Sequence, residues 1–84
     1  MEKIKIEGKR IYLYSHQIDM RMGMEKIQVF LSQNFSTSEL QDSIFVFISK
    51  SRKIAKVYVE DEFGRWLIIW KLNYTSFKIP RSDI

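Results

Sequence analysis

Few side chains in this sequence have the types and spacing that acid–base or nucleophilic chemistry requires. The chain of 84 residues contains one histidine, His16, and no cysteine. Nucleophilic catalysis needs a base beside the nucleophile, and no serine stands in a G-x-S-x-G turn. The only acidic cluster is Glu60-Asp61-Glu62, at the tip of a predicted hairpin, where carboxylates are usually solvated turn formers. We therefore expect no enzyme activity, no metal site and no cofactor.

The basic residues give a stronger signal. The net charge is +4, and four cations fall within one short stretch, at a predicted turn and in the strand that leaves it. Such a hairpin can bind phosphates, with Tyr58 or Trp66 stacking on a base. The same cations can instead protect strand edges from aggregation, so both interpretations stay open. The four cations are Lys50, Arg52, Lys53 and Lys56.

An apolar strand predicted over residues 65–72 offers a second kind of surface. Trp66, Ile68 and Trp70 alternate onto one of its faces, and further apolar residues lie on the other. Paired tryptophans usually belong to a core. If a single helix cannot cover so much apolar area, however, the sheet can pair with a second copy of the chain or with another protein.

Short β-rich segments separated by charged turns predict an antiparallel sheet. In the segment 54–60, we expect Ala55, Val57 and Val59 to face the core, because the other side carries Lys56, Tyr58 and Glu60. Strands are predicted over residues 3–7, 10–14, 43–49, 54–60 and 65–72, with a short edge strand over 77–79 that Pro80 ends.

One helix is predicted to begin at Asp19, whose carboxylate can accept hydrogen bonds from the first turn. Its apolar stripe has helical spacing, and Gly23 is expected to allow close packing of the helix on the sheet. The helix should end near Asn34, with residues 34–38 as a loop. The stripe consists of Met20, Met24, Ile27, Leu31 and Phe35.

These elements predict a single α+β domain over residues 1–84, in which one helix packs on an antiparallel sheet of about five strands. Residues 81–84 are expected to form a loose tail. No apolar run approaches the roughly 20 residues that span a bilayer, and the N-terminus lacks a signal-peptide core. We therefore expect a cytoplasmic protein that does not bind membranes.

The order of several motifs resembles one family of bacterial proteins. A strand is followed by D-M-R-x-G and a helix, then by F-V-F, a basic turn, a lysine, an aspartate, a glycine, an aromatic-rich strand, and a final phenylalanine and proline. Over about residues 10–80, this pattern is similar to the TnpB accessory proteins. These are products of the second open reading frame of insertion sequences of the IS-sixty-six type, distinct from the RNA-guided nucleases that share the name. The residues that carry the resemblance are Asp19, Met20, Arg21, Gly23, Phe45, Val46, Phe47, Lys56, Asp61, Gly64, Trp66, Leu67, Leu72, Phe77 and Pro80.

The resemblance implies a non-catalytic accessory protein that supports DNA transposition beside a separate transposase. Our hypothesis, motivated by the basic hairpin, is that it contacts DNA, the transposase or both. Arg21 and Lys56 rank first as DNA contacts because they fall on family motif positions. Alternatively, Arg21 can stabilise the start of the helix by interacting with Asp19. The predicted nucleic-acid-binding residues are Arg21, Lys50, Arg52, Lys53, Lys56, Arg65 and Lys71.

The alternative hypothesis is a protein-interaction module without DNA binding. It would dock on the transposase, or associate with itself as a homodimer, through the aromatic face of the sheet.

Overall fold

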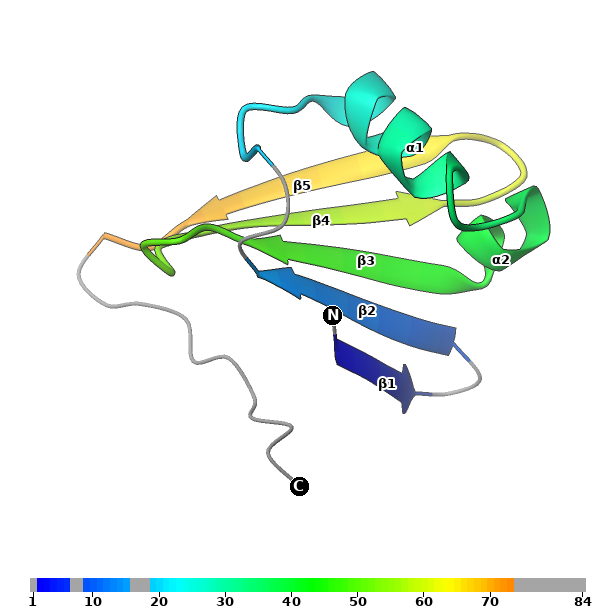
Figure 1. Ribbon diagram of the computed structural model, residues 1–84, viewed down its shortest axis with the longest axis horizontal. Helices are drawn as coiled ribbons and strands as arrows, with labels where there is room; N and C mark the ends of the chain where they lie inside the picture. Colours follow the sequence, from blue (N-terminus) through cyan, green and yellow to red (C-terminus); the bar gives the residue numbers. More distant parts are fainter. Residues whose placement is uncertain (1, 7–8, 16–18, 74–84) are drawn as a thin grey trace.

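The computed structural model describes residues 2–6, 9–15 and 19–73, and it describes side chains from Lys9 onward. Five strands form one sheet in the order β1-β2-β3-β4-β5 (Figure 1). His16, the strand predicted over 77–79 with Pro80, and the tail 81–84 lie outside the described residues. The elements are β1 (Glu2–Ile6), β2 (Lys9–Ser15), α1 (Met24–Ser32), α2 (Thr37–Gln41), β3 (Ser43–Ile48), β4 (Ile54–Glu60) and β5 (Arg65–Lys71).

The sheet is mixed. β1 and β2 form one antiparallel pair, and β3, β4 and β5 pair antiparallel in sequence order. β2 and β3, however, run parallel. A parallel pair needs a crossover connection that returns the chain to the same end of the sheet, and α1 and α2 lie in that connection. The α+β class holds, but the prediction of a purely antiparallel sheet is wrong at this one pair.

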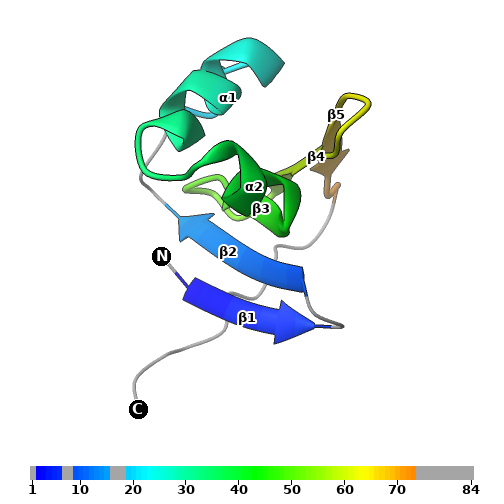
Figure 2. The same ribbon diagram turned by 90° about the vertical axis from the view of Figure 1, so that its right-hand side faces the viewer.

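Two helices, rather than the predicted one, lie on the same side of the sheet (Figure 2). α1 begins after Gly23, so Asp19 is not its N-cap. α2 lies where a loop was predicted, and a capping box starts it: the Glu39 N–H donates to Ser36 Oγ at 3.2 Å, and the Ser36 N–H donates to Glu39 Oε1 at 2.9 Å. The close-packing role expected for Gly23 is wrong, since a Cβ there would meet no atom within 4 Å.

An aromatic core fills the space between the helices and the sheet. Tyr12 stacks on Phe45 with 5.3 Å between ring centroids, and Tyr14 stacks on Phe47 at 5.1 Å. These contacts cross the parallel β2–β3 pair, where the stacked residues are direct register partners. Burying a side chain of this size stabilises a fold by about 1.5–3 kcal/mol. The helices contribute the buried Ile27, Leu31 and Leu40. Met20 and Phe35 were expected on α1 but lie outside that helix, and both pack against the core.

β4 presents to this core the side that the sequence suggested was solvated. Lys56, Tyr58 and Glu60 are buried, at 8%, 0% and 8% exposure. The Tyr58 hydroxyl donates to Glu60 Oε1 at 2.5 Å, which satisfies both polar groups inside the domain. Burial and this hydrogen bond raise the pKa of Tyr58 above its ordinary value. The expectation that Ala55, Val57 and Val59 face the helix-covered core is therefore wrong.

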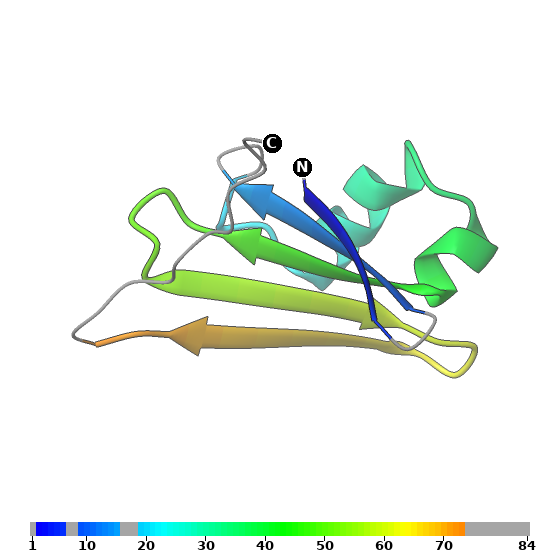
Figure 3. The same cartoon turned by 90° about the horizontal axis from the view of Figure 1, so that it is seen from below.

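The opposite side of the sheet is mostly apolar from β2 to β5, and no described helix covers it; Figure 3 shows the sheet from below. Successive side chains of a strand alternate between faces, so the strand registers define which residues share this side. We call it the open face; two of its side chains, Ile48 and Ala55, are nevertheless buried, at 6% and 5% exposure. Across β2, β3, β4 and β5, its three rows are Ile11, Ile44, Val59 and Trp66; Leu13, Val46, Val57 and Ile68; and Ser15, Ile48, Ala55 and Trp70.

Neither described helix has the length and apolar character that crossing a bilayer requires.

Candidate nucleic-acid interface

The turn between β3 and β4 presents three exposed cations, Lys50, Arg52 and Lys53. Ser49 holds the turn closed. Its buried hydroxyl accepts from the Ile54 N–H at 3.1 Å, and its backbone N–H donates to the Ile54 carbonyl at 2.9 Å. The cations are thus presented by a hydrogen-bonded turn anchored to two strands.

Arg52 has a φ of 61°, in the left-handed region that non-glycine residues rarely adopt. Its backbone N–H donates to the Ser49 carbonyl at 2.9 Å, which holds this conformation within the turn. A β-branched replacement would strain the backbone here, whereas asparagine tolerates the left-handed region.

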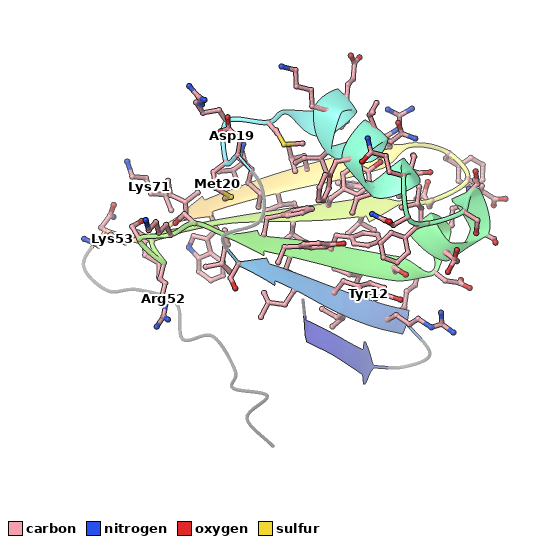
Figure 4. The ribbon with its side chains drawn as sticks, viewed as in Figure 1. Tyr12, Asp19, Met20, Arg52, Lys53 and Lys71 are labelled. Atoms are coloured by element: carbon pink, nitrogen blue, oxygen red, sulfur yellow. The ribbon has the colours of Figure 1, made fainter. Side chains whose placement is uncertain are left out.

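A fourth cation, Lys71, joins the turn from β5. Ile54 is its register partner, and the Leu72 N–H donates to the Lys53 carbonyl at 2.7 Å, so the end of β5 lies directly beside the turn. Figure 4 shows Arg52, Lys53 and Lys71 at the same end of the sheet. None of the four side chains forms an ion pair with another residue that the structure describes. We call Lys50, Arg52, Lys53 and Lys71 the basic end.

Arg21 precedes α1, and its charge is already paired. Its Nη2 donates to Asp19 Oδ2 at 2.7 Å, and its Nε donates to the same carboxylate. These side-chain hydrogen bonds, together with one from the Arg21 backbone N–H, lower the pKa of Asp19 to about 2. The Asp19–Arg21 pair thus stabilises the loop before α1, which agrees with the alternative role of Arg21 as a partner of Asp19 at the start of the helix. Although the guanidinium is exposed, Arg21 brings no unpaired positive charge.

Lys56 is not a surface cation. Its side chain lies on the helix-covered side of β4, and its Nζ donates to the Met22 carbonyl at 2.9 Å. The bond connects the middle of the sheet to the loop before α1. The burial of Lys56 therefore removes its side chain from the surface on which the three cations of the turn stand, so the structure does not support a surface contact between Lys56 and DNA.

Arg65 lies at the other end of β5, opposite Glu60 in register. It is six residue steps along the extended strand from Lys71, which corresponds to about 20 Å. Of the seven predicted residues, the structure therefore brings four together at the basic end, holds Arg21 in an ion pair, buries Lys56 and places Arg65 far away.

The acidic cluster at the β4–β5 hairpin is divided between two structural roles. Glu60 is buried against Tyr58, while Asp61 Oδ1 accepts from the backbone N–H groups of Phe63 and Gly64 at 2.8 and 2.9 Å. Across the described residues there is no group of three or more histidine, cysteine, aspartate or glutamate side chains placed to hold a metal ion.

Sequence reasoning missed most of the open face as a candidate surface. Trp66 and Ile68 are 62% and 52% exposed. Their register partners, Val59 and Val57, were expected to be core residues. The register of the β4–β5 hairpin could have identified this surface. When β4 and β5 pair across Asp61–Gly64, the exposed side of β5 and the small apolar residues of β4 must share one face of the sheet.

Most residues of the D-M-R-x-G and F-V-F motifs have structural roles in this fold. Asp19 and Arg21 form the ion pair, Met20 packs on the core, and Phe45 and Phe47 are fully buried. Trp66 differs, since its motif position is exposed on the open face. Phe77 and Pro80 lie outside the described residues.

The described residues thus define a small α+β domain with a cluster of exposed cations at one end of the sheet and an apolar sheet face that no described helix covers. Residues 9–84 match the model of the family described as IS66 Orf2 like protein, also designated TnpB of IS66. The chain belongs to this family of insertion-sequence-associated accessory proteins. Comparison with curated proteins and with solved structures found no match.

Proposed function

We propose that this protein supports DNA transposition as a non-catalytic accessory factor that binds duplex DNA through the basic end. The observation that carries the proposal is the convergence of four exposed cations, from one turn and the neighbouring strand, without an ion-pair partner among the described residues. Cations that neutralise phosphates release condensed counterions, which favours DNA binding independently of sequence.

The geometry suits a backbone contact rather than base readout. Lys50, Arg52 and Lys53 stand on a short turn, and no described helix projects from this end to enter a groove. Since phosphate contacts position a protein without specifying sequence, we expect affinity for any duplex. Sequence choice would then come from the transposase.

The affinity for a short fluorescent duplex, measured by anisotropy at about 50 and 200 mM salt, tests this proposal. Four phosphate contacts predict a fall in affinity of about 100-fold across that range. The double variant Arg52→Asn, Lys53→Gln should bind about 10-fold more weakly at the lower salt and reduce the salt slope by about 2. Asparagine at position 52 preserves the turn because it tolerates a positive φ.

Arg65→Gln is the control, because it removes one cation at the end of β5 that lies away from the basic end. Its affinity should stay within about 2-fold of the unmodified protein. Absence of binding at about 50 mM salt would overturn the proposal. A logarithmic loss in the control of about half that in the double variant would also contradict it, because the number of cations removed, one against two, would then account for both results.

A second candidate function is a protein-interaction module without DNA binding, and the open face favours it. Trp66 and Ile68 expose more than half of their surface there. The two candidates use different surfaces, and retention of the element's transposase by a protein that binds no duplex would favour this second one.

A further inference from the structure

We infer that the open face is the interface of a homodimer, formed when two copies of this chain pack their sheets face to face. The inference specifies the surface of the second candidate function by naming a second copy of the chain as its occupant, and it stands whether or not the basic end binds DNA.

The composition of the open face is the first argument. Eleven of its twelve positions are apolar, and Ser15 is the exception. The central row, formed by Leu13, Val46, Val57 and Ile68, contains only aliphatic side chains. Such a face has the composition of an interior surface, in which the inner sides of two sheets interdigitate about 10 Å apart.

The second argument is charge, which favours a second copy of the chain over a polyanion as the partner of the open face. The twelve positions of the open face include no lysine, arginine, aspartate or glutamate, so a polyanion finds no partner among them. Lys9 lies on the same side of β2 but beyond these rows, and its Nζ donates to the Gln41 carbonyl at 3.3 Å. A second copy with the same net charge of +4 can approach this face without bringing like charges into contact. Lys71 is on the helix side of β5, and the other cations of the basic end stand on a turn at the edge of the sheet.

The size of the face is the third argument. Four strands about 4.8 Å apart, each contributing about 20 Å of length, cover a footprint of about 400 Å². Ile48 and Ala55 are already buried and add little to this area. With the protruding indole of Trp66 included, two copies would together bury at most roughly 800–1,000 Å², which is the range of weak, transient interfaces and not of stable ones. We therefore expect a reversible dimer with a dissociation constant of about 1–100 µM.

β5 itself provides a matched pair of probes. Ile68 and Ile69 are consecutive, of the same residue type and similarly exposed, at 52% and 60%. They point to opposite sides of the sheet, Ile68 to the open face and Ile69 to the helix side. Threonine at either position keeps the β-branched shape that suits a strand, but it replaces the ethyl group of isoleucine with a hydroxyl group.

Sedimentation equilibrium of the full chain over about 1–500 µM tests the inference, at a salt concentration that suppresses non-specific association. The unmodified protein should dimerise, Ile68→Thr should raise the dissociation constant at least 10-fold, and Ile69→Thr should leave it within about 2-fold. Trp66→Thr is a second open-face variant in case Ile68→Thr folds poorly. Circular dichroism spectra verify that each variant retains the fold.

Tryptophan emission gives an independent readout, because both tryptophans of the chain are on the open face. Emission should move to shorter wavelength as the protein concentration rises, and this shift should be absent in Ile68→Thr. A monomer throughout the concentration range would overturn the inference. If, in such a monomer, Ile68→Thr destabilises the fold more than Ile69→Thr does, another segment of the same chain covers the face. Equal effects of Ile68→Thr and Ile69→Thr on dimerisation would indicate pairing through the β5 edge and would also overturn it.

Discussion

At the scale of single residues, Lys56 shows why residue type alone does not identify a DNA contact. Its aliphatic stem lies among core side chains, and only the amine reaches a polar partner, the Met22 carbonyl at 2.9 Å. Long cationic side chains commonly bury their stems in this way while the charge finds a polar group. The charge of Lys56 therefore stabilises the loop before α1 rather than the surface.

The variant Lys56→Met tests this role because it keeps the apolar stem and removes the amine. It should lower the free energy of unfolding by about 1–3 kcal/mol, since the Met22 carbonyl loses a charged donor. Urea denaturation measures this loss. Duplex affinity, measured where the variant is fully folded, should be unchanged. Weaker DNA binding together with unchanged stability would contradict the structural role and return Lys56 to the candidate DNA contacts.

At the scale of elements, α2 depends on its first turn because it has only five residues. Ser36→Ala removes the hydroxyl that accepts from the Glu39 N–H, and loss of such a cap typically lowers the free energy of unfolding by about 1 kcal/mol. Ser32→Ala is the control: its hydroxyl donates to the Gln28 carbonyl within α1, a bond that adds little to helix stability. Equal costs in the two variants would contradict the importance of the cap.

The same cap gives α2 a pH dependence. Hydrogen bonds from the backbone N–H of Ser36, and then from its side chain, lower the pKa of Glu39. A carboxyl group with a lowered pKa in the folded state stabilises the fold above its ordinary pKa and loses this effect as the pH falls through the folded value. The Ser36→Ala variant should therefore show a higher Glu39 pKa by NMR titration. Its stability deficit should shrink on acidification by the part due to Glu39 ionisation, while the part due to the lost bond from the Glu39 N–H stays.

The strands could be located from sequence because their signal is local. Alternation and β-branched composition gave residues 54–60 for β4 and 43–49 for β3, close to the observed bounds. Pairing and facing depend on non-local contacts. β3 is apolar on both sides, so its own pattern does not show which side the helices cover. The buried face of β4 is defined by two hydrogen bonds that its sequence pattern does not show, one from Tyr58 to Glu60 and one from Lys56 to the Met22 carbonyl.

The helices were harder to locate because apolar spacing does not distinguish a helix from a loop that packs on the same core. Met20 and Phe35 fit the stripe of α1 and contact the core, yet both lie outside the helix. The start of α2 did have a local signal, since Ser36-Thr37-Ser38-Glu39 fits the S-x-x-E capping box. Among the candidate DNA contacts, sequence proximity correctly grouped the turn cations, but only the β4–β5 register brought Lys71 to them.

At the scale of the whole molecule, charge and apolar area are separated in space. The four cations of the basic end lie at one end of the sheet (Figure 4), the helices cover one face, and the rows of the open face are apolar apart from Ser15. A two-fold dimer through the open face would bury apolar surface while leaving both basic ends exposed. DNA binding and self-association are then compatible in one particle, because neither uses residues that the other needs.

This arrangement predicts that thermal stability depends on protein concentration. A partner that binds only the folded chain stabilises it by mass action, and 1 kcal/mol corresponds to a shift in Tm of about 4–8 °C for a domain of this size. A 100-fold increase in concentration around the dissociation constant should raise Tm by roughly 5 °C. Ile69→Thr should follow the same slope, whereas Ile68→Thr should show a constant Tm, because its open face no longer pairs. Calorimetry of the three proteins at matched concentrations measures this, and an equal slope in both variants would place the self-association elsewhere on the molecule.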